Sequence, residues 1–184
     1  MNSAAQILAG TVGQISLVYN TRLSSIKSLF LLATNSTADS CGKFDAVDIT
    51  KSNGTVQFQV AGVSYPQTPY STSQNKAGML MSLRQAVGSI FDRTNSLSIN
   101  AVEFNRIDGD ATTLIAPGKH IPAVDTEIVD SSYILSGISS ANSAITVQVQ
   151  CGTALTDPHS CNLVIAYDAI LEVDFVQGQV SVKM

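Results

Sequence analysis

A strict alternation of apolar and polar residues, repeated along the chain, is the feature that most limits how it can fold. Between Thr55 and Val60 the sequence reads TVQFQV, so that every second side chain is apolar. This period of two is typical of a strand with one buried and one polar face. Similar segments recur throughout the 184 residues, separated by connections rich in Gly, Asn, Asp, Ser and Pro. The pattern predicts an all-β, antiparallel sandwich in a single domain spanning residues 1–184.

The predicted strands are 13–19, 26–34, 55–60, 63–66, 96–104, 132–137, 145–151, 162–175 and 179–184. We expect the last two to pair as a hairpin across Gln177 and Gly178, because glycine adopts the positive φ that a tight turn requires. Segment 105–125 has no clear period and contains two prolines. It is therefore expected to be a long loop.

One segment changes from the strand period to the helical one. Leu80, Leu83 and Val87 are spaced three or four residues apart, as on one face of a helix. The spacing predicts one main α-helix over about 73–90, after the strand near 55–66. We expect its apolar face to be buried against an open edge or end of the sandwich. The candidate N-caps are Ser71, Thr72 and Ser73.

Charged residues are scarce, at 13% of the chain, and the formal net charge is -4. The sequence has no basic cluster, so direct binding to nucleic acid or anionic lipid is not expected. No run approaches the roughly 18 apolar residues of a membrane span. Arg22 is the first cation, so the start does not resemble a secretory signal. A neutral, polar surface favours packing against neighbouring subunits.

The three cysteines are odd in number and irregularly spaced, which argues against a disulfide framework. We expect Cys41, Cys151 and Cys161 to be mostly reduced, in a reducing compartment, although a Cys151–Cys161 disulfide remains open. With Asp157 and His159, the last two cysteines have the residue types of metal ligands. Their spacing matches no standard zinc site.

Candidate catalytic residues are few. His120 and His159 are the only histidines, both lie in turn-like sequence, and no G-x-S-x-G elbow accompanies them. We expect both to be solvated loop residues. The DGD at 108–110 lacks the remaining oxygen ligands of a calcium loop, and the isolated glycines form no phosphate-binding loop. The sequence thus predicts no catalytic residue, no cofactor, no metal site and no enzymatic activity.

Several segments taken together resemble a known family. They are FQVAGVSYPQTPYST, the helix with LRQAVGS, SINAVEF, PGKHIP, LSGISSANSAITVQVQ, and the closing DAILEVDF and QVSV. In this order, over about residues 16–184, they resemble the C-terminal jelly roll of double-jelly-roll viral major capsid proteins. That lineage includes adenovirus hexon, tailless membrane-containing phages, virophages and polintons.

The resemblance implies a β-sandwich of jelly-roll type in a viral major capsid protein. Three copies would form a capsomer that joins other capsid proteins in an icosahedral shell. The protein would be made in the cytoplasm or nucleus of a host cell and would reside in the virion capsid. The family has two jelly rolls side by side, whereas this sequence has room for one. It is therefore either one half of a larger protein or a single-jelly-roll subunit.

The proline-bearing segment YPQTPY is the predicted subunit contact. Its prolines lack the backbone N–H and hold the preceding residues extended, so we expect the chain to leave the sheet here as a rigid corner. A rigid corner loses little entropy when a neighbour docks on it, and tyrosine is enriched at protein interfaces. The candidate contact residues are Tyr65, Pro66, Gln67, Pro69 and Tyr70.

Two other functions remain open from the sequence. A non-enzymatic binding module, such as a lectin-like or receptor-binding domain of a viral spike or pilus, should show a concave polar and aromatic site. The chain has no Trp to supply such a platform. An enzyme of the cupin type should show a cluster of His and carboxylate metal ligands inside the sandwich.

Overall fold

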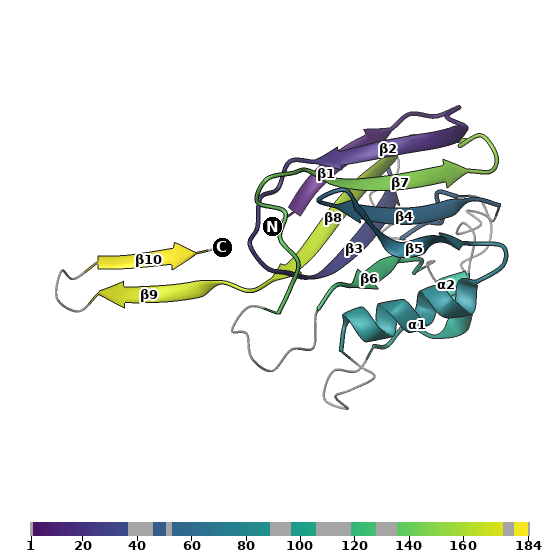
Figure 1. The fold of residues 1–184 in the computed structure, drawn as a ribbon. Coiled ribbons are helices and arrows are strands. Elements are labelled where there is room, and N and C mark those ends of the chain that lie inside the picture. The colour runs from purple at the N-terminus through teal and green to yellow at the C-terminus, as the bar shows by residue number, and fades with distance from the viewer. Residues whose placement is uncertain are drawn as a thin grey trace.

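Two four-stranded antiparallel sheets pack face to face in the computed structural model of the chain (Figure 1). The structure describes residues 2–36, 46–50, 53–88, 97–105, 119–127, 136–174 and 179–183. The first sheet contains, in spatial order, β1 (Asn2–Ile7), β8 (His159–Tyr167), β3 (Ile26–Asn35) and β6 (Ala123–Asp125). The second contains β2 (Gly13–Tyr19), β7 (Ile145–Cys151), β4 (Thr55–Val60) and β5 (Val63–Ser71). The predicted all-β antiparallel sandwich is confirmed.

The alternation of the sequence divides the side chains between core and surface. In β7, Ile145, Val147 and Val149 are fully buried, while the residues between them lie at the surface. The inward side chains of both sheets form one hydrophobic cluster. Because side chains in a strand alternate between faces, a shift of one residue in a central strand would place its polar residues in this cluster. The alternation therefore fixes the register as well as the fold class.

The strand pairs are nested about a central hairpin. β4 pairs with β5 across the two-residue turn Ala61-Gly62, where both residues have positive φ, as a tight hairpin turn requires. Outside this hairpin, β3 pairs with β6, β2 with β7 and β1 with β8. Two further pairings, β3 with β8 and β4 with β7, join these pairs into the two sheets. The chain is thus arranged as one long antiparallel hairpin folded over onto itself.

The main helix is α1 (Lys76–Ala86), which lies beside β6 and a second hydrophobic cluster. Leu80 and Leu83 are buried as predicted, and Val87 is partly buried against the same cluster. The predicted N-caps, Ser71, Thr72 and Ser73, were wrong, because Asn75 caps the helix. The side chain of Asn75 accepts a hydrogen bond from the Gly78 N–H at 3.0 Å. The helix thus begins three residues later than predicted, and residues 89–90 of the predicted range lie outside the described residues.

The predicted strand over 96–104 is wrong, because its second half is the short helix α2 (Ala101–Asn105). The Asn100 side chain accepts a hydrogen bond from the Glu103 N–H at 2.9 Å, and the Glu103 carboxylate accepts one from the Asn100 N–H at 3.1 Å. This reciprocal capping satisfies two backbone donors that a helix start otherwise leaves unpaired. It places Phe104, which is fully buried, in the second cluster.

Other differences concern where strands begin and end. The strand predicted to stop at Pro66 continues to Ser71 as β5. The segment predicted as one strand over 162–175 is interrupted at Asp168 and Ala169. β1 was not predicted, and β6 lies within the segment predicted as a loop. Most of the strand predicted over 132–137 lies outside the described residues.

The last two strands form a separate two-stranded sheet, here called the arm: β9 (Ile170–Asp174) and β10 (Gln179–Lys183). The predicted pairing of these strands is confirmed, and the connecting residues 175–178 lie outside the described residues. Figure 1 shows the arm projecting from one end of the sandwich. Its strands make their main contacts with each other. The arm therefore extends the molecule beyond the two packed sheets.

Candidate functional site

The four outer edges of the two sheets differ in how they are protected. Exposed edges present unpaired backbone groups, and natural proteins commonly protect them with proline, charge or a covering element. β6 is only three residues long and α1 lies beside it. β5 contains Pro66 and Pro69. β1 and β2 contain neither proline nor a charged residue. Within the described part of the chain, the edges of β1 and β2 therefore lack these protections and are the two most open to pairing with another strand.

The predicted contact segment forms a bulge on the β5 edge. Opposite β4, Tyr65 pairs with Phe58 and Tyr70 pairs with Val56, so the residues between the tyrosines face a single residue, Gln57. The Gln57 side chain donates hydrogen bonds to the carbonyl oxygens of Pro66, at 2.9 Å, and of Gln67, at 3.1 Å. The prediction that the chain leaves the sheet here as a corner was wrong, because the segment is part of the edge strand β5 and is bound to β4 through Gln57.

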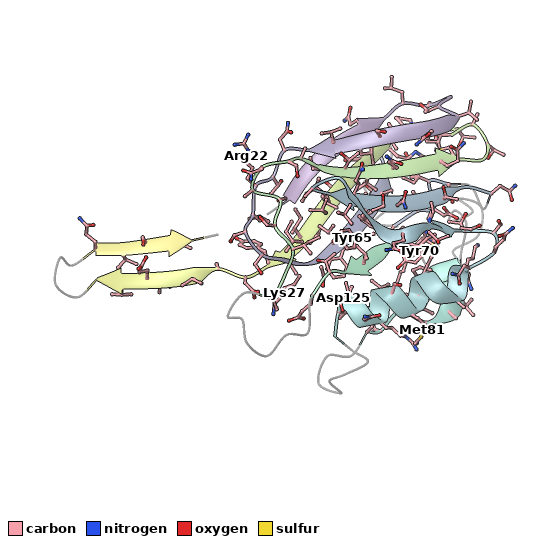
Figure 2. The ribbon with its side chains drawn as sticks, viewed as in Figure 1. Arg22, Lys27, Tyr65, Tyr70, Met81 and Asp125 are labelled. Atoms are coloured by element: carbon pink, nitrogen blue, oxygen red, sulfur yellow. The ribbon has the colours of Figure 1, made fainter. Side chains whose placement is uncertain are left out.

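The five candidate contact residues are not equally available at the surface. Gln67 and Pro69 are exposed, and Pro66 is partly buried. Tyr65 is partly buried against the main core, and Tyr70 is buried with its hydroxyl donating to the Ser82 hydroxyl (Figure 2). Burial raises the pKa of Tyr70, and the Ser82 hydrogen bond opposes this effect. Any contact here is made by the bulge, and the tyrosines support it from the core side.

The outer face of the second sheet carries no charge. None of the outward residues of β2, β7 and β4 is charged, and their register places Gln57 opposite Gln148 and Gln14 opposite Gln150. The Gln14 side-chain amide donates to the Gln148 amide oxygen at 3.4 Å. A shallow hollow lies among these four glutamines, Thr55 and Pro69. The face offers many hydrogen-bond donors and acceptors and attracts neither anions nor cations.

A buried polar pair lies where segment 46–50, α2 and the residues before β6 meet. His120 Nδ1 lies 3.1 Å from the Phe104 carbonyl oxygen. Because a carbonyl only accepts, this nitrogen carries the proton in the neutral ring. His120 Nε2 lies 3.9 Å from Asp48 Oδ1, which accepts hydrogen bonds from the Thr50 N–H and hydroxyl. His120 Nε2 and Asp48 Oδ2 have no hydrogen-bond partner within the described ranges.

This pair is sealed from solvent. His120 is 2% exposed and Asp48 is 1% exposed, and His159 is also buried, so the prediction of solvated loop histidines was wrong. Burial lowers the pKa of His120, although the Asp48 carboxylate acts to raise it. A catalytic acid or base must reach its substrate. In this geometry the pair connects three segments of the fold.

The two described cysteines are free, buried thiols. Cys151 donates a hydrogen bond to the Ile49 carbonyl oxygen at 3.2 Å. Burial, with a smaller effect of Cys151, raises the pKa of Cys161 to about 12, and burial also raises the pKa of Cys151. Reactive cysteines have lowered pKa values, so both behave as core residues. Cys41 lies outside the described residues.

Within the described part of the chain, no group of three or more His, Cys, Asp or Glu side chains could hold a metal ion. The residues Cys151, Asp157, His159 and Cys161 therefore do not converge on one metal position. No helix among the described residues is long and apolar enough to cross a membrane.

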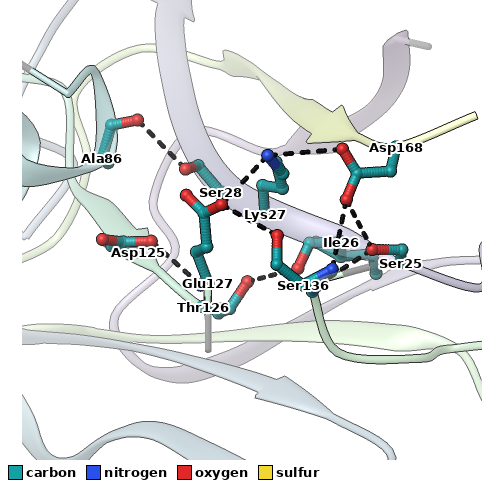
Figure 3. Close-up of polar contacts among 11 residues, drawn as sticks. Ser25, Ile26, Lys27, Ser28, Ala86, Asp125, Thr126, Glu127, Ser136 and Asp168 are labelled. Atoms are coloured by element: carbon teal, nitrogen blue, oxygen red, sulfur yellow. Dashed lines mark hydrogen bonds and ion pairs between the residues drawn. The ribbon is translucent and has the colours of Figure 1, made fainter. Parts of the chain in front are cut away.

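An ion-pair network lies at the base of the arm (Figure 3). Lys27 Nζ lies 3.0 Å from a Glu127 oxygen and 3.3 Å from an Asp168 oxygen. Ser25 donates to the other Asp168 oxygen at 2.9 Å, and the Asp168 N–H donates to the Ser25 carbonyl at 3.0 Å. The Lys27 hydrogen bond is the main cause that lowers the pKa of Glu127. The network holds Asp168, the first of the two residues between β8 and β9, in place.

No protein-family model matches the sequence, and no curated protein matches it. The function is therefore inferred from the fold, the edges and the buried groups described above.

Proposed function

We propose that this chain is a structural protein, a viral major capsid protein subunit that assembles with itself into capsomers of an icosahedral shell. The observation that carries the proposal is the nested pairing of eight strands, β1 with β8, β2 with β7, β3 with β6 and β4 with β5. A long hairpin folded over in this way is the connectivity expected of a jelly roll, an architecture that recurs in viral capsids. The helix between β5 and β6 agrees with the order of segments that carries the family resemblance.

The distribution of polar and charged groups supports an assembly role. The described histidines and cysteines are buried, so they stabilise the fold and offer no reactive group to a substrate. The outer face of the second sheet is uncharged, and two sheet edges are open. Repeated subunit contacts need surfaces that neighbours can approach without charge repulsion, in closed symmetric arrangements. By resemblance, the capsomer is a trimer that joins other capsid proteins.

Electron microscopy of the purified protein tests this proposal. We expect ring-shaped or trimeric capsomers, or closed shells, under conditions that favour assembly, such as high protein concentration and raised salt. Particles that stay monomeric under every such condition would contradict it. Far-UV circular dichroism should show that the purified protein is folded.

A second candidate function is a non-enzymatic binding module, favoured by the hollow among Gln14, Gln57, Gln148 and Gln150. Side-chain amides both donate and accept hydrogen bonds, as sugar hydroxyls do, and the absence of charge favours a neutral glycan. Titration calorimetry with neutral oligosaccharides tests this function. Binding that is lost in Gln148→Ala, in a protein that stays monomeric, would favour the binding module over the capsid subunit.

A further inference from the structure

We infer that the arm of one copy pairs with the open edge of β2 in a second copy and covers the core residues at that edge. This inference rests on the proposed self-assembly and specifies which surfaces make the contact. The arm is a two-stranded sheet without the third strand or covering layer that such a sheet usually requires.

One face of the arm is entirely apolar and exposed. Val173 lies opposite Val180, and Leu171 lies opposite Val182. These side chains are 41%, 64%, 63% and 56% exposed, respectively. An isolated hairpin is marginally stable in water, and a third strand or a covering layer is usually required. The alternating sequence of the arm is typical of a sheet with one buried face. Among the described residues, however, its two strands contact mainly each other, and no other element packs over the apolar face.

The base of the arm is held in a defined position. Asp168, which directly follows β8, is bound by Ser25 through two hydrogen bonds and by Lys27 through an ion pair (Figure 3). The arm is thus presented in a preferred direction before any neighbour arrives. A preorganised segment loses less conformational entropy on binding than a free tail does.

The edge of β2 has the features that this arm requires. Its sequence, GQISLVY, contains neither charge nor proline, so its outer backbone groups can accept another strand. On the core side of this edge, Ile15 of β2 and Ala5 of β1 are only partly buried against the main cluster. A strand added beside β2 would extend the second sheet. The apolar face of the arm would then cover these two residues.

Charge also matches between the two surfaces. Arg22 is exposed and follows β2 by three residues, and Figure 2 shows it projecting from the sandwich. The polar face of the arm carries Glu172, opposite Ser181. An arm paired with β2 would bring Glu172 toward the cation of the second copy. Both surfaces belong to this one chain, so the partner that we infer is a second copy.

The size of the contact indicates how it operates. Five residues per strand at ~3.4 Å each, in two strands that each occupy ~4.8 Å of width, give a face of roughly 160 Å². A standard interface buries about 800 Å² per partner. One arm therefore binds weakly, and the contact becomes stable when it is repeated, as in a twofold exchange of arms or a closed ring.

Hydrogen exchange combined with sedimentation, at low and high protein concentration, tests the inference. In the wild-type protein we expect the amides of the arm and of β2 to become protected together as the protein associates. The double variant V173T/V180T keeps side-chain shape and makes half of the apolar face of the arm polar. In this variant we expect the amides of the arm and of β2 to remain unprotected from exchange at high protein concentration. We also expect association to be at least tenfold weaker, while the melting temperature of the sandwich is unchanged. The matched control is V102T, which alters an exposed valine of α2 and should associate normally.

A charge exchange provides a second measurement. We expect R22E to weaken association several-fold and R22E/E172K to restore it. Association with no change in protection at β2 and the arm, or normal association of V173T/V180T, would overturn the inference and leave the proposed function standing. Arm-dependent pairs that form no capsomer would support the inference and contradict the proposed function. A protein that remains monomeric at all concentrations would overturn both.

Discussion

At the scale of single residues, burial decides the chemistry of the histidines and cysteines. His120 lies in PGKHIP, a sequence that suggests an exposed turn, yet the ring lies against Phe104 with their centroids 4.7 Å apart. Nothing in the local sequence indicates this contact, because Phe104 comes from a helix that alternation had assigned to a strand. The residue types of the candidate sites could be read from the sequence. Their burial depends on which distant segments meet.

The first prediction concerns pH. Because burial holds the pKa of His120 below its usual value, the unfolded chain binds a proton near pH 6.5 that the folded chain does not. The free energy of unfolding should therefore be highest above about pH 6.5 and fall as the pH drops below it. Urea unfolding between about pH 5 and 8 measures this. In His120→Gln, which cannot titrate, the fall should be smaller, and equal slopes in the two proteins would contradict the prediction.

At the scale of elements, the long periodic segments could be predicted and the short ones could not. β2, β4 and β7 show clear alternation in the sequence, β3 contains a continuous apolar run, and the structure places strands there. Residues 96–104 also alternate, but Asn100 and Glu103 have the spacing of a capping box, and this second signal identifies α2. β6 has only three residues, too few to show a period. The position of β6 is set by its pairing with β3 and by α1 beside it.

The second prediction tests the packing of α1. Leu83 is 2% exposed within the second hydrophobic cluster, so Leu83→Ala should lower the free energy of unfolding by about 2–5 kcal/mol through lost burial and a residual cavity. Met81, on the same helix, is 51% exposed and provides the control. Met81→Ala should change stability by roughly 0.5 kcal/mol or less. Denaturant unfolding measures both, and equal effects would contradict the placement of the helix.

The third prediction tests the bulge on β5 as a subunit contact. Tyr70 is buried, so its replacement would disturb the fold and could not report on a surface. Gln67 and Pro69 are exposed, and Q67A/P69A should leave the melting temperature within a few degrees of the wild type. We expect this variant to fold and to assemble poorly, as judged by light scattering. Assembly at the normal rate would show that the prolines only protect the edge from pairing.

At the scale of the whole molecule, alternation predicts the sandwich but not the order of its strands. Many strand orders satisfy the same inward and outward pattern, and the nested order depends on contacts such as β1 with β8, which join strands far apart in the sequence. The arm illustrates the same limit. Leu171 and Val173 alternate with acidic residues like any half-buried strand, so the sequence could not show that their apolar face lies outside the core. That exposed face is the observation on which the inferred arm contact rests.

The central claim is that this chain assembles with itself, and its mass in solution tests that claim most directly. Sedimentation velocity over a wide range of protein concentration should reveal species at multiples of the 19.4 kDa chain, with a trimeric capsomer as the smallest stable assembly. The fraction of these species should rise with concentration, because each contact is small and repeated. A single species of 19.4 kDa at every concentration, from a protein that is folded, would contradict the account.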